Sequence, residues 1–157
     1  YSETLKASLT IIKACLSSLP SEPDNLGRPN GSRREISDLA PSRDRILAAF
    51  ADGDMILNIN GPEQWDGSFQ TTSLGSRWYH NAIDMRDIDN IGVAFEVGAA
   101  TIEDEDIPGT DCNAINSGSV SITPLSSWPV NHPLGLSEVL LSEATNQSSS
   151  GLPKWLD

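Results

Sequence analysis

A chain of 157 residues with 38% apolar residues and a net charge of −12 is long enough for one domain with one modest core. Its acidic surface would repel nucleic-acid phosphates and anionic lipid, which argues against non-specific nucleic-acid binding by residues 55–157. No run of eighteen apolar residues is present, so an ordinary membrane-spanning helix is not expected.

The first predicted element is an amphipathic helix over residues 2–19, which Pro20 ends. Its large apolar residues recur at steps of three and four and fall on one face; they are Leu5, Leu9, Ile12, Leu16 and Leu19. We expect this stripe to pack against the β region of the chain or against a neighbouring subunit.

A loop rich in proline and glycine follows over residues 20–36, and then a second, shorter helix. Pro41 and Ser42 favour a helix start, and the apolar side of the helix comes from Ile46, Leu47 and Phe50. Gly53 stands where a glycine commonly ends a helix.

From Met55 the apolar period changes towards two, which is typical of strands. The expected strands cover residues 55–60, 68–74, 77–83, 91–97 and 119–125. Pro124 indicates an edge strand or a strand end, and residues 135–144 fit either a strand or a helix capped by Ser137.

This order of elements predicts an α+β fold, with one or two N-terminal helices packed on an antiparallel sheet of short strands. No helical pattern interrupts the strand candidates, which disfavours alternating β and α units. We expect a single domain over 1–157, with a helical part at 1–54, a mainly β part at 55–144 and a polar tail at 145–157.

Basic residues cluster in the N-terminal third of the chain. Five of the seven arginines gather within eighteen residues: Arg28, Arg33, Arg34, Arg43 and Arg45. Guanidinium groups bind phosphates and carboxylates through paired hydrogen bonds, so the cluster predicts a binding surface for such groups. A solvated loop with local ion pairs is the alternative.

Carboxylates cluster later, in a stretch that contains glycine and proline. Glu103, Asp104, Asp106 and Asp111 offer the hard oxygen ligands that Ca²⁺ prefers, although their spacing matches no defined calcium loop. A solvated acidic loop is the favoured interpretation, so we expect no cofactor; a calcium site and a contact with a basic partner are the alternatives.

Two tryptophans stand in turn-like surroundings, Trp65 before Asp66-Gly67 and Trp128 before Pro129. Such side chains stack on sugars, anchor interfaces or fill cores. The two cysteines, Cys15 and Cys112, could form one bridge, but a buried free thiol is favoured for Cys15.

No glycine-rich phosphate loop, dinucleotide fingerprint or paired-cysteine metal motif is present. The hypothesis that follows is a non-catalytic structural or assembly subunit, such as a viral shell, coat or surface component, extracellular or in a virion. It would self-associate through the arginine-rich and acidic loops. The alternatives are a secreted carbohydrate- or calcium-dependent binding module, and a hydrolase that uses His80 with Asp84.

Overall fold

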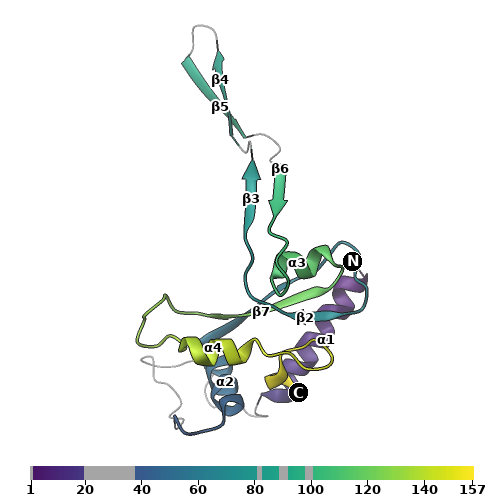
Figure 1. The fold of residues 1–157 in the computed structure, drawn as a ribbon, viewed down its shortest axis with the longest axis vertical. Coiled ribbons are helices and arrows are strands. Elements are labelled where there is room, and N and C mark those ends of the chain that lie inside the picture. Colours follow the sequence, from purple (N-terminus) through teal and green to yellow (C-terminus); the bar gives the residue numbers. More distant parts are fainter. Residues whose placement is uncertain (1, 20–37, 81–82, 89–91, 98–100) are drawn as a thin grey trace.

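The computed structural model describes the whole chain except residues 1, 20–37, 81–82, 89–91 and 98–100. The helices are α1 (Ser2–Ser18), α2 (Ser42–Ala51), α3 (Asp111–Asn116), α4 (Glu138–Ala144) and the short 3₁₀ helix η2 (Lys154–Leu156). The strands are β1 (Met55–Asn60), β2 (Phe69–Thr71), β3 (Arg77–His80), β4 (Ile83–Ile88), β5 (Gly92–Val97), β6 (Thr101–Asp104) and β7 (Val120–Ser126). A body of helices around a small sheet carries a long, narrow arm of strands (Figure 1).

The body contains a three-stranded sheet in the order β1-β7-β2. β1 runs antiparallel to β7, whereas β2 runs parallel to it. The chain between β2 and β7 passes along the arm and returns through α3, so β7 enters the sheet in the direction of β2 (Figure 1). The α+β prediction is confirmed, with a mixed sheet in place of a purely antiparallel one.

β7 is the central strand, although its proline suggested an edge. β2 pairs only with Val120 to Ile122, so Pro124 lies beyond the end of β2 and faces β1 alone, opposite Leu57. A residue without an N–H is tolerated at such a position because no strand needs its donor on that side. The proline therefore marks where pairing becomes one-sided.

The arm consists of two antiparallel ribbons, β3 with β6 and β4 with β5. They extend from the body, β3–β6 next to it and β4–β5 at the tip (Figure 1). β4 and β6 were not predicted, because acidic residues interrupt the apolar alternation in both. Glu103 and Asp104 thus belong to a strand and not to a loop.

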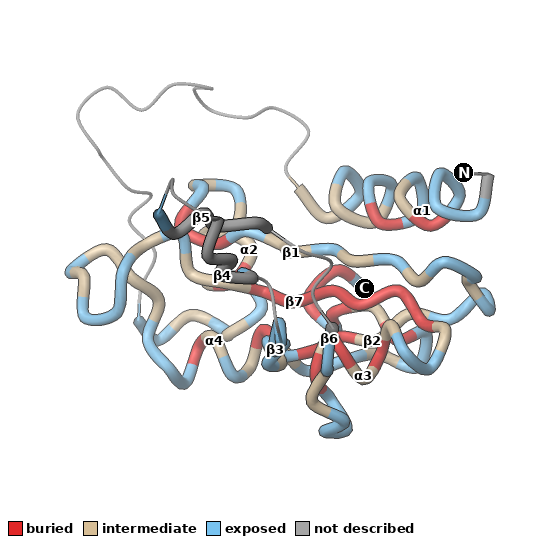
Figure 2. Tube along the Cα trace, turned by 90° about the horizontal axis from the view of Figure 1, so that it is seen from above, coloured by how far each residue is buried: buried red, intermediate tan, exposed pale blue. Residues whose placement is uncertain are grey.

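α1 packs with the face opposite to the one predicted. Ala7 and Ile11 are buried against Val120 and Ile122 of β7, and Cys15 packs beside them. The predicted leucine stripe instead lies on the outer side of the helix, so buried and exposed segments alternate along α1 in Figure 2. The small Ala7 side chain lets the helix approach the sheet closely, which explains why the less apolar face is the buried one.

The C-terminal segment is part of the core and not a polar tail. Trp155 and Leu156 are buried together with Ile46 of α2, Met55 of β1 and Leu140 of α4. Burial of these apolar side chains stabilises the C-terminal segment on the body, although residues 145–151 are polar. α4 settles the ambiguity over 135–144: Ser137 caps it by accepting from the Leu140 N–H.

Both cysteines are free thiols, Cys15 half-buried and Cys112 buried. Among the described helices, none combines the length and the hydropathy needed to cross a membrane.

Candidate functional site

A cavity of about 280 Å³ lies beside α2 in the body. α2 contributes one wall, the turn that leads into β1 a second, and the start of α4 a third. Its lining residues are Asp38, Arg45, Ala48, Ala49, Asp52, Asp54, Gly135, Leu136, Ser137 and Leu140. Four of these residues are charged and four are apolar, so the cavity is more polar than the usual small-molecule site.

Asp54 and Trp128 fix the wall near β1. The buried Asp54 carboxylate accepts a hydrogen bond from Trp128 Nε1 at 2.8 Å. The indole stacks on the His132 ring with 4.5 Å between centroids and 6° between planes. His132 in turn accepts from the Leu134 N–H through Nδ1, so a ring contact and a hydrogen bond both stabilise the loop before the cavity.

Arg45 is the cationic group among the residues that line the cavity. Its Nη2 lies 3.3 Å from Asp38 Oδ1, and that carboxylate is almost fully exposed. An exposed ion pair of this kind contributes little free energy. The Arg45 guanidinium can therefore leave Asp38 and bind a ligand with little loss of stability. With Asp52 and Asp54 also present, the cavity offers both an anion-binding fork and hydrogen-bond acceptors.

The predicted arginine cluster does not act as one surface in the described part of the chain. Arg43 donates to the backbone oxygen of Asp157 at 2.8 Å, whereas Arg45 faces the cavity. Arg28, Arg33 and Arg34 lie outside the described residues. The prediction therefore found one lining residue, Arg45, and it missed Asp52 and Asp54, whose proximity to α4 no local pattern indicates.

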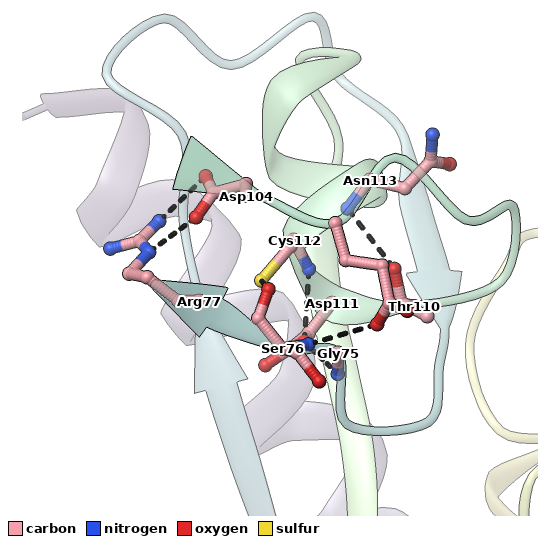
Figure 3. A network of polar contacts seen from close by, with 9 residues as sticks. Gly75, Ser76, Arg77, Asp104, Thr110, Asp111, Cys112 and Asn113 are labelled. Carbon is pink, nitrogen blue, oxygen red and sulfur yellow. Dashed lines mark hydrogen bonds and ion pairs between the residues drawn. The ribbon is translucent and has the colours of Figure 1, made fainter. Parts of the chain in front are cut away.

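A second polar cluster ties the base of the arm to α3 (Figure 3). Asp111 Oδ1 accepts from the Gly75 N–H at 2.7 Å and from the Cys112 N–H at 2.9 Å. Thr110 caps α3 by accepting from the Asn113 N–H. Gly75 approaches Thr110 so closely that a side chain would be in tight contact there. This cluster anchors the start of β3.

The predicted calcium ligands each have another partner. Glu103 lies 3.0 Å from His80 Nε2, Asp104 pairs with Arg77, and Asp106 accepts from Asn113 Nδ2. No group of three or more histidine, cysteine or carboxylate side chains able to hold a metal ion occurs among the described residues. The calcium site stays a prediction without support from this geometry.

Arg77 controls the ionisation of Asp104 at the arm base. The two side chains form a bidentate pair, with Nη2 2.9 Å from Oδ2, and its hydrogen bonds hold the pKa of Asp104 below its usual range. We expect Arg77→Gln to raise that pKa in a carbon-13 NMR titration. The pKa of Asp66, lowered by the Ser68 hydroxyl and N–H, is the internal control and should not move.

The lowered pKa of Asp104 makes the stability of the fold depend on pH. A carboxyl group with a lowered pKa in the folded state stabilises the fold above its ordinary pKa, and this contribution is lost as the pH falls through the lowered value. An unchanged Asp104 titration in Arg77→Gln would contradict the role given to the pair.

The remaining predicted residues have local partners. Trp65 packs on Phe69 at 5.2 Å between ring centroids and donates from Nε1 to the Ser68 carbonyl at 2.7 Å. Both rings pack against the apolar cluster that α1 forms with Val120 and Ile122 of β7. His80 lies on the exposed arm with Glu103 as its partner. The side chain of Asp84 lies outside the described residues.

No model of a known protein family matches the chain. Several curated proteins do resemble it, and each carries the name 5′-nucleotidase SurE. The protein from Heliobacterium modesticaldum is 34% identical over 95 residues, which cover 58% of this chain and 35% of that protein. The relative from Desulforamulus reducens is 40% identical over 74 residues (45% and 29%), and that from Methanoregula boonei 32% over 85 residues (53% and 32%).

These relatives overturn the hypothesis of a non-catalytic structural, shell or coat subunit, because proteins named as nucleotidases resemble half of the chain. The absence of motifs misled that inference: an active centre assembled from distant residues leaves no short pattern in a sequence. Self-association stays a prediction. The chain spans only 29–35% of the length of these three relatives.

Proposed function

We propose that this chain takes part in the hydrolysis of nucleoside 5′-monophosphates, as a portion of a SurE-type phosphatase. Its similarity to 5′-nucleotidases, at 32–40% identity, is the observation that supports this function. In the reaction a water molecule attacks phosphorus and the bond from phosphorus to the 5′ oxygen breaks. The leaving 5′ oxygen takes up a proton from the attacking water, so the products are inorganic phosphate and the nucleoside with a free 5′ hydroxyl group.

In this proposal the cavity beside α2 holds the nucleotide. Its volume, about 280 Å³, is near the lower end for ligand pockets. Ala48, Ala49 and Leu140 offer apolar contact to a base, and the Asp52 carboxylate accepts from ribose hydroxyls. The planar donors of Arg45 suit a phosphate group.

The charge of the cavity sets a condition on this reaction. Its carboxylates outnumber its guanidinium, so a phosphate there needs further positive charge to bind well. Phosphoryl transfer commonly recruits divalent cations for this purpose. The described residues do not gather three metal ligands, so they do not fit a metal site by themselves, and no step is assigned to a metal.

A covalent mechanism through Cys112 is not part of the proposal. Burial, with the negative charge of Asp111, raises the pKa of the Cys112 thiol, which keeps it protonated at neutral pH. Water, not this thiol, is therefore the nucleophile that the proposal uses.

Nucleotide binding tests the role of the cavity. Adenosine 5′-monophosphate should bind the chain in isothermal titration calorimetry, and Arg45→Gln should weaken binding by roughly ten- to a hundredfold because a charged hydrogen bond contributes roughly 1.5–3 kcal/mol. Arg43→Gln is the matched control: it lies two residues away and contacts Asp157, so it should bind as the unaltered chain does. Equal affinities for the two variants would remove the cavity from the proposal.

Turnover tests the function itself. The full-length gene product should release phosphate from adenosine 5′-monophosphate faster than from the 3′-monophosphate, as followed by a colorimetric phosphate assay. Loss of turnover on addition of EDTA, restored by Mg²⁺ or Mn²⁺, would establish metal dependence. A preparation that releases no phosphate from any nucleoside monophosphate, with or without added metal, contradicts the function.

A further inference from the structure

Charge is divided along the side of α2 that lines the cavity. Arg45, Ala48, Ala49 and Asp52 all line it, and their spacing of three, one and three residues places them on one side of the helix. Arg45 lies near the start of α2 and Asp52 directly after its last residue, so about 10 Å of helix axis separates them. Asp54 follows at the same acidic end. The cavity therefore has a basic end and an acidic end, and a nucleotide can bridge the distance between them.

The carboxylate of Asp54 is fixed at the acidic end by three hydrogen bonds. The backbone N–H of Asp54 donates to the Ala49 carbonyl at 2.8 Å, and its carbonyl accepts from the Ser127 N–H at 2.9 Å. Trp128 Nε1 donates to Oδ1 of the side chain at 2.8 Å, and only 5% of the residue is exposed. A carboxylate can accept about four hydrogen bonds on its two oxygens, and the bond from Trp128 uses one of them. Asp54 is thus a buried, positioned acceptor in the cavity wall.

Guanine is the nucleobase whose edge complements a carboxylate. Its N1–H and its 2-amino group are adjacent donors, and they match the two oxygens of a carboxylate side by side. Adenine and cytosine each present an amino group next to a ring nitrogen whose lone pair would face the carboxylate. Uracil presents one N–H between two carbonyl oxygens. A fixed carboxylate therefore favours guanine over the other three bases.

We propose that the cavity beside α2 selects guanosine 5′-monophosphate and that Asp54 recognises its base. The inference rests on the proposed function, in which Arg45 binds the phosphate group of the same nucleotide. The Asp54 carboxylate accepts from N1–H and from the 2-amino group of guanine, while the ring lies against Ala48 and Ala49. A base without these donors binds less tightly, because a buried carboxylate oxygen is then left without a hydrogen-bond donor.

Support of Trp128 does not by itself require a carboxylate at position 54. The indole N–H needs one oxygen acceptor, which the amide of an asparagine also provides. A buried carboxylate is more costly than a buried amide unless further donors reach it. This difference allows Asp54→Asn to keep the contact with Trp128 and to change only the group that is presented to the base.

Isothermal titration calorimetry on the 157-residue chain tests the selectivity. Guanosine 5′-monophosphate should bind at least about tenfold more tightly than adenosine 5′-monophosphate, because two hydrogen bonds to a charged group are at stake. Inosine 5′-monophosphate should fall between the two, since it keeps the N1–H but lacks the 2-amino group. Equal affinities for the guanosine and adenosine nucleotides overturn the inference.

Asp54→Asn should change which nucleotide is preferred. The asparagine amide donates where the carboxylate accepted, so the variant should lose its preference for the guanosine nucleotide and prefer xanthosine 5′-monophosphate, whose 2-carbonyl oxygen accepts that bond. Asp44→Asn is the matched control, because Asp44 is exposed on α2 and does not line the cavity; it should keep the guanosine preference. A purely structural role of Asp54 would weaken all nucleotides alike, and that result contradicts the inference.

Phosphate release by the full-length gene product separates this inference from the proposed function. Turnover of nucleoside 5′-monophosphates without any guanine preference in binding keeps the function and overturns the role of Asp54. Guanine-selective binding that Asp54→Asn redirects, in a protein that releases no phosphate, keeps the recognition site and removes the function. If the chain binds no nucleotide at all, the inference fails, and the turnover assay still decides the function.

Discussion

Replacing Trp155 by alanine should destabilise the fold by about 3–5 kcal/mol, as is typical of buried tryptophans. Its side chain is 3% exposed and packs on Phe50 with 5.3 Å between ring centroids. Its Nε1 donates to the Ala144 carbonyl at 3.1 Å, so truncation also leaves a buried acceptor without its partner. The result would be a melting temperature lower by roughly 10 °C, measured by calorimetry and by urea denaturation.

Trp78→Ala is the matched control for this prediction. Trp78 lies on β3 of the arm and half of its side chain is already exposed, so its removal should cost less than about 1 kcal/mol. Equal losses for the two variants would show that the C-terminal segment is not part of the core.

Gly151→Ala should be almost as costly, at about 3–5 kcal/mol, from strain and overlap together. Gly151 has φ +84°, a conformation that side chains disfavour, and a Cβ there would overlap the carbonyl of Phe69 in β2. The carbonyl of Gly151 also accepts from Thr71 Oγ1 at 2.9 Å, so any shift of the loop breaks a buried contact with β2. Thermal unfolding and hydrogen exchange of the β2 amides report this loss.

Gly53→Ala separates overlap from backbone strain. Gly53 has φ +75°, but a Cβ at this position meets no atom within 4 Å. Its cost should be only about 1–2 kcal/mol, the penalty of the left-handed conformation alone. If Gly151→Ala destabilises no more than Gly53→Ala does, the close approach to Phe69 is not present in solution.

Local patterns predicted several elements correctly. The apolar period located α2 and β1, and α2 begins at Ser42 directly after Pro41, as predicted, although no side chain caps it there. Ser137 marked the cap of α4. α3 was missed, although Thr110 before Asp111 is a favourable cap, because the helix is only six residues long.

The candidate site was predicted only in part, for a physical reason. Arg45 stood out because arginines cluster along the chain. Asp54 did not, because its significance depends on Trp128, which is 74 residues away in the sequence. The acidic residues are a different case. Neighbours along a strand such as Glu103 and Asp104 point to opposite sides, so nearness in sequence does not by itself bring their carboxylates together.

The sequence by itself determined the α+β class, the positions of α1, α2 and β7, and the acidic character of the C-terminal two-thirds. The tertiary structure decided which face of α1 is buried, the central place of β7, and the burial of Trp155. Periodicity reports that a helix has an apolar face, whereas the shape and small size of Ala7 against Val120 decide which face the sheet accepts. Packing of this kind depends on residues more than a hundred positions apart, and no local pattern contains it.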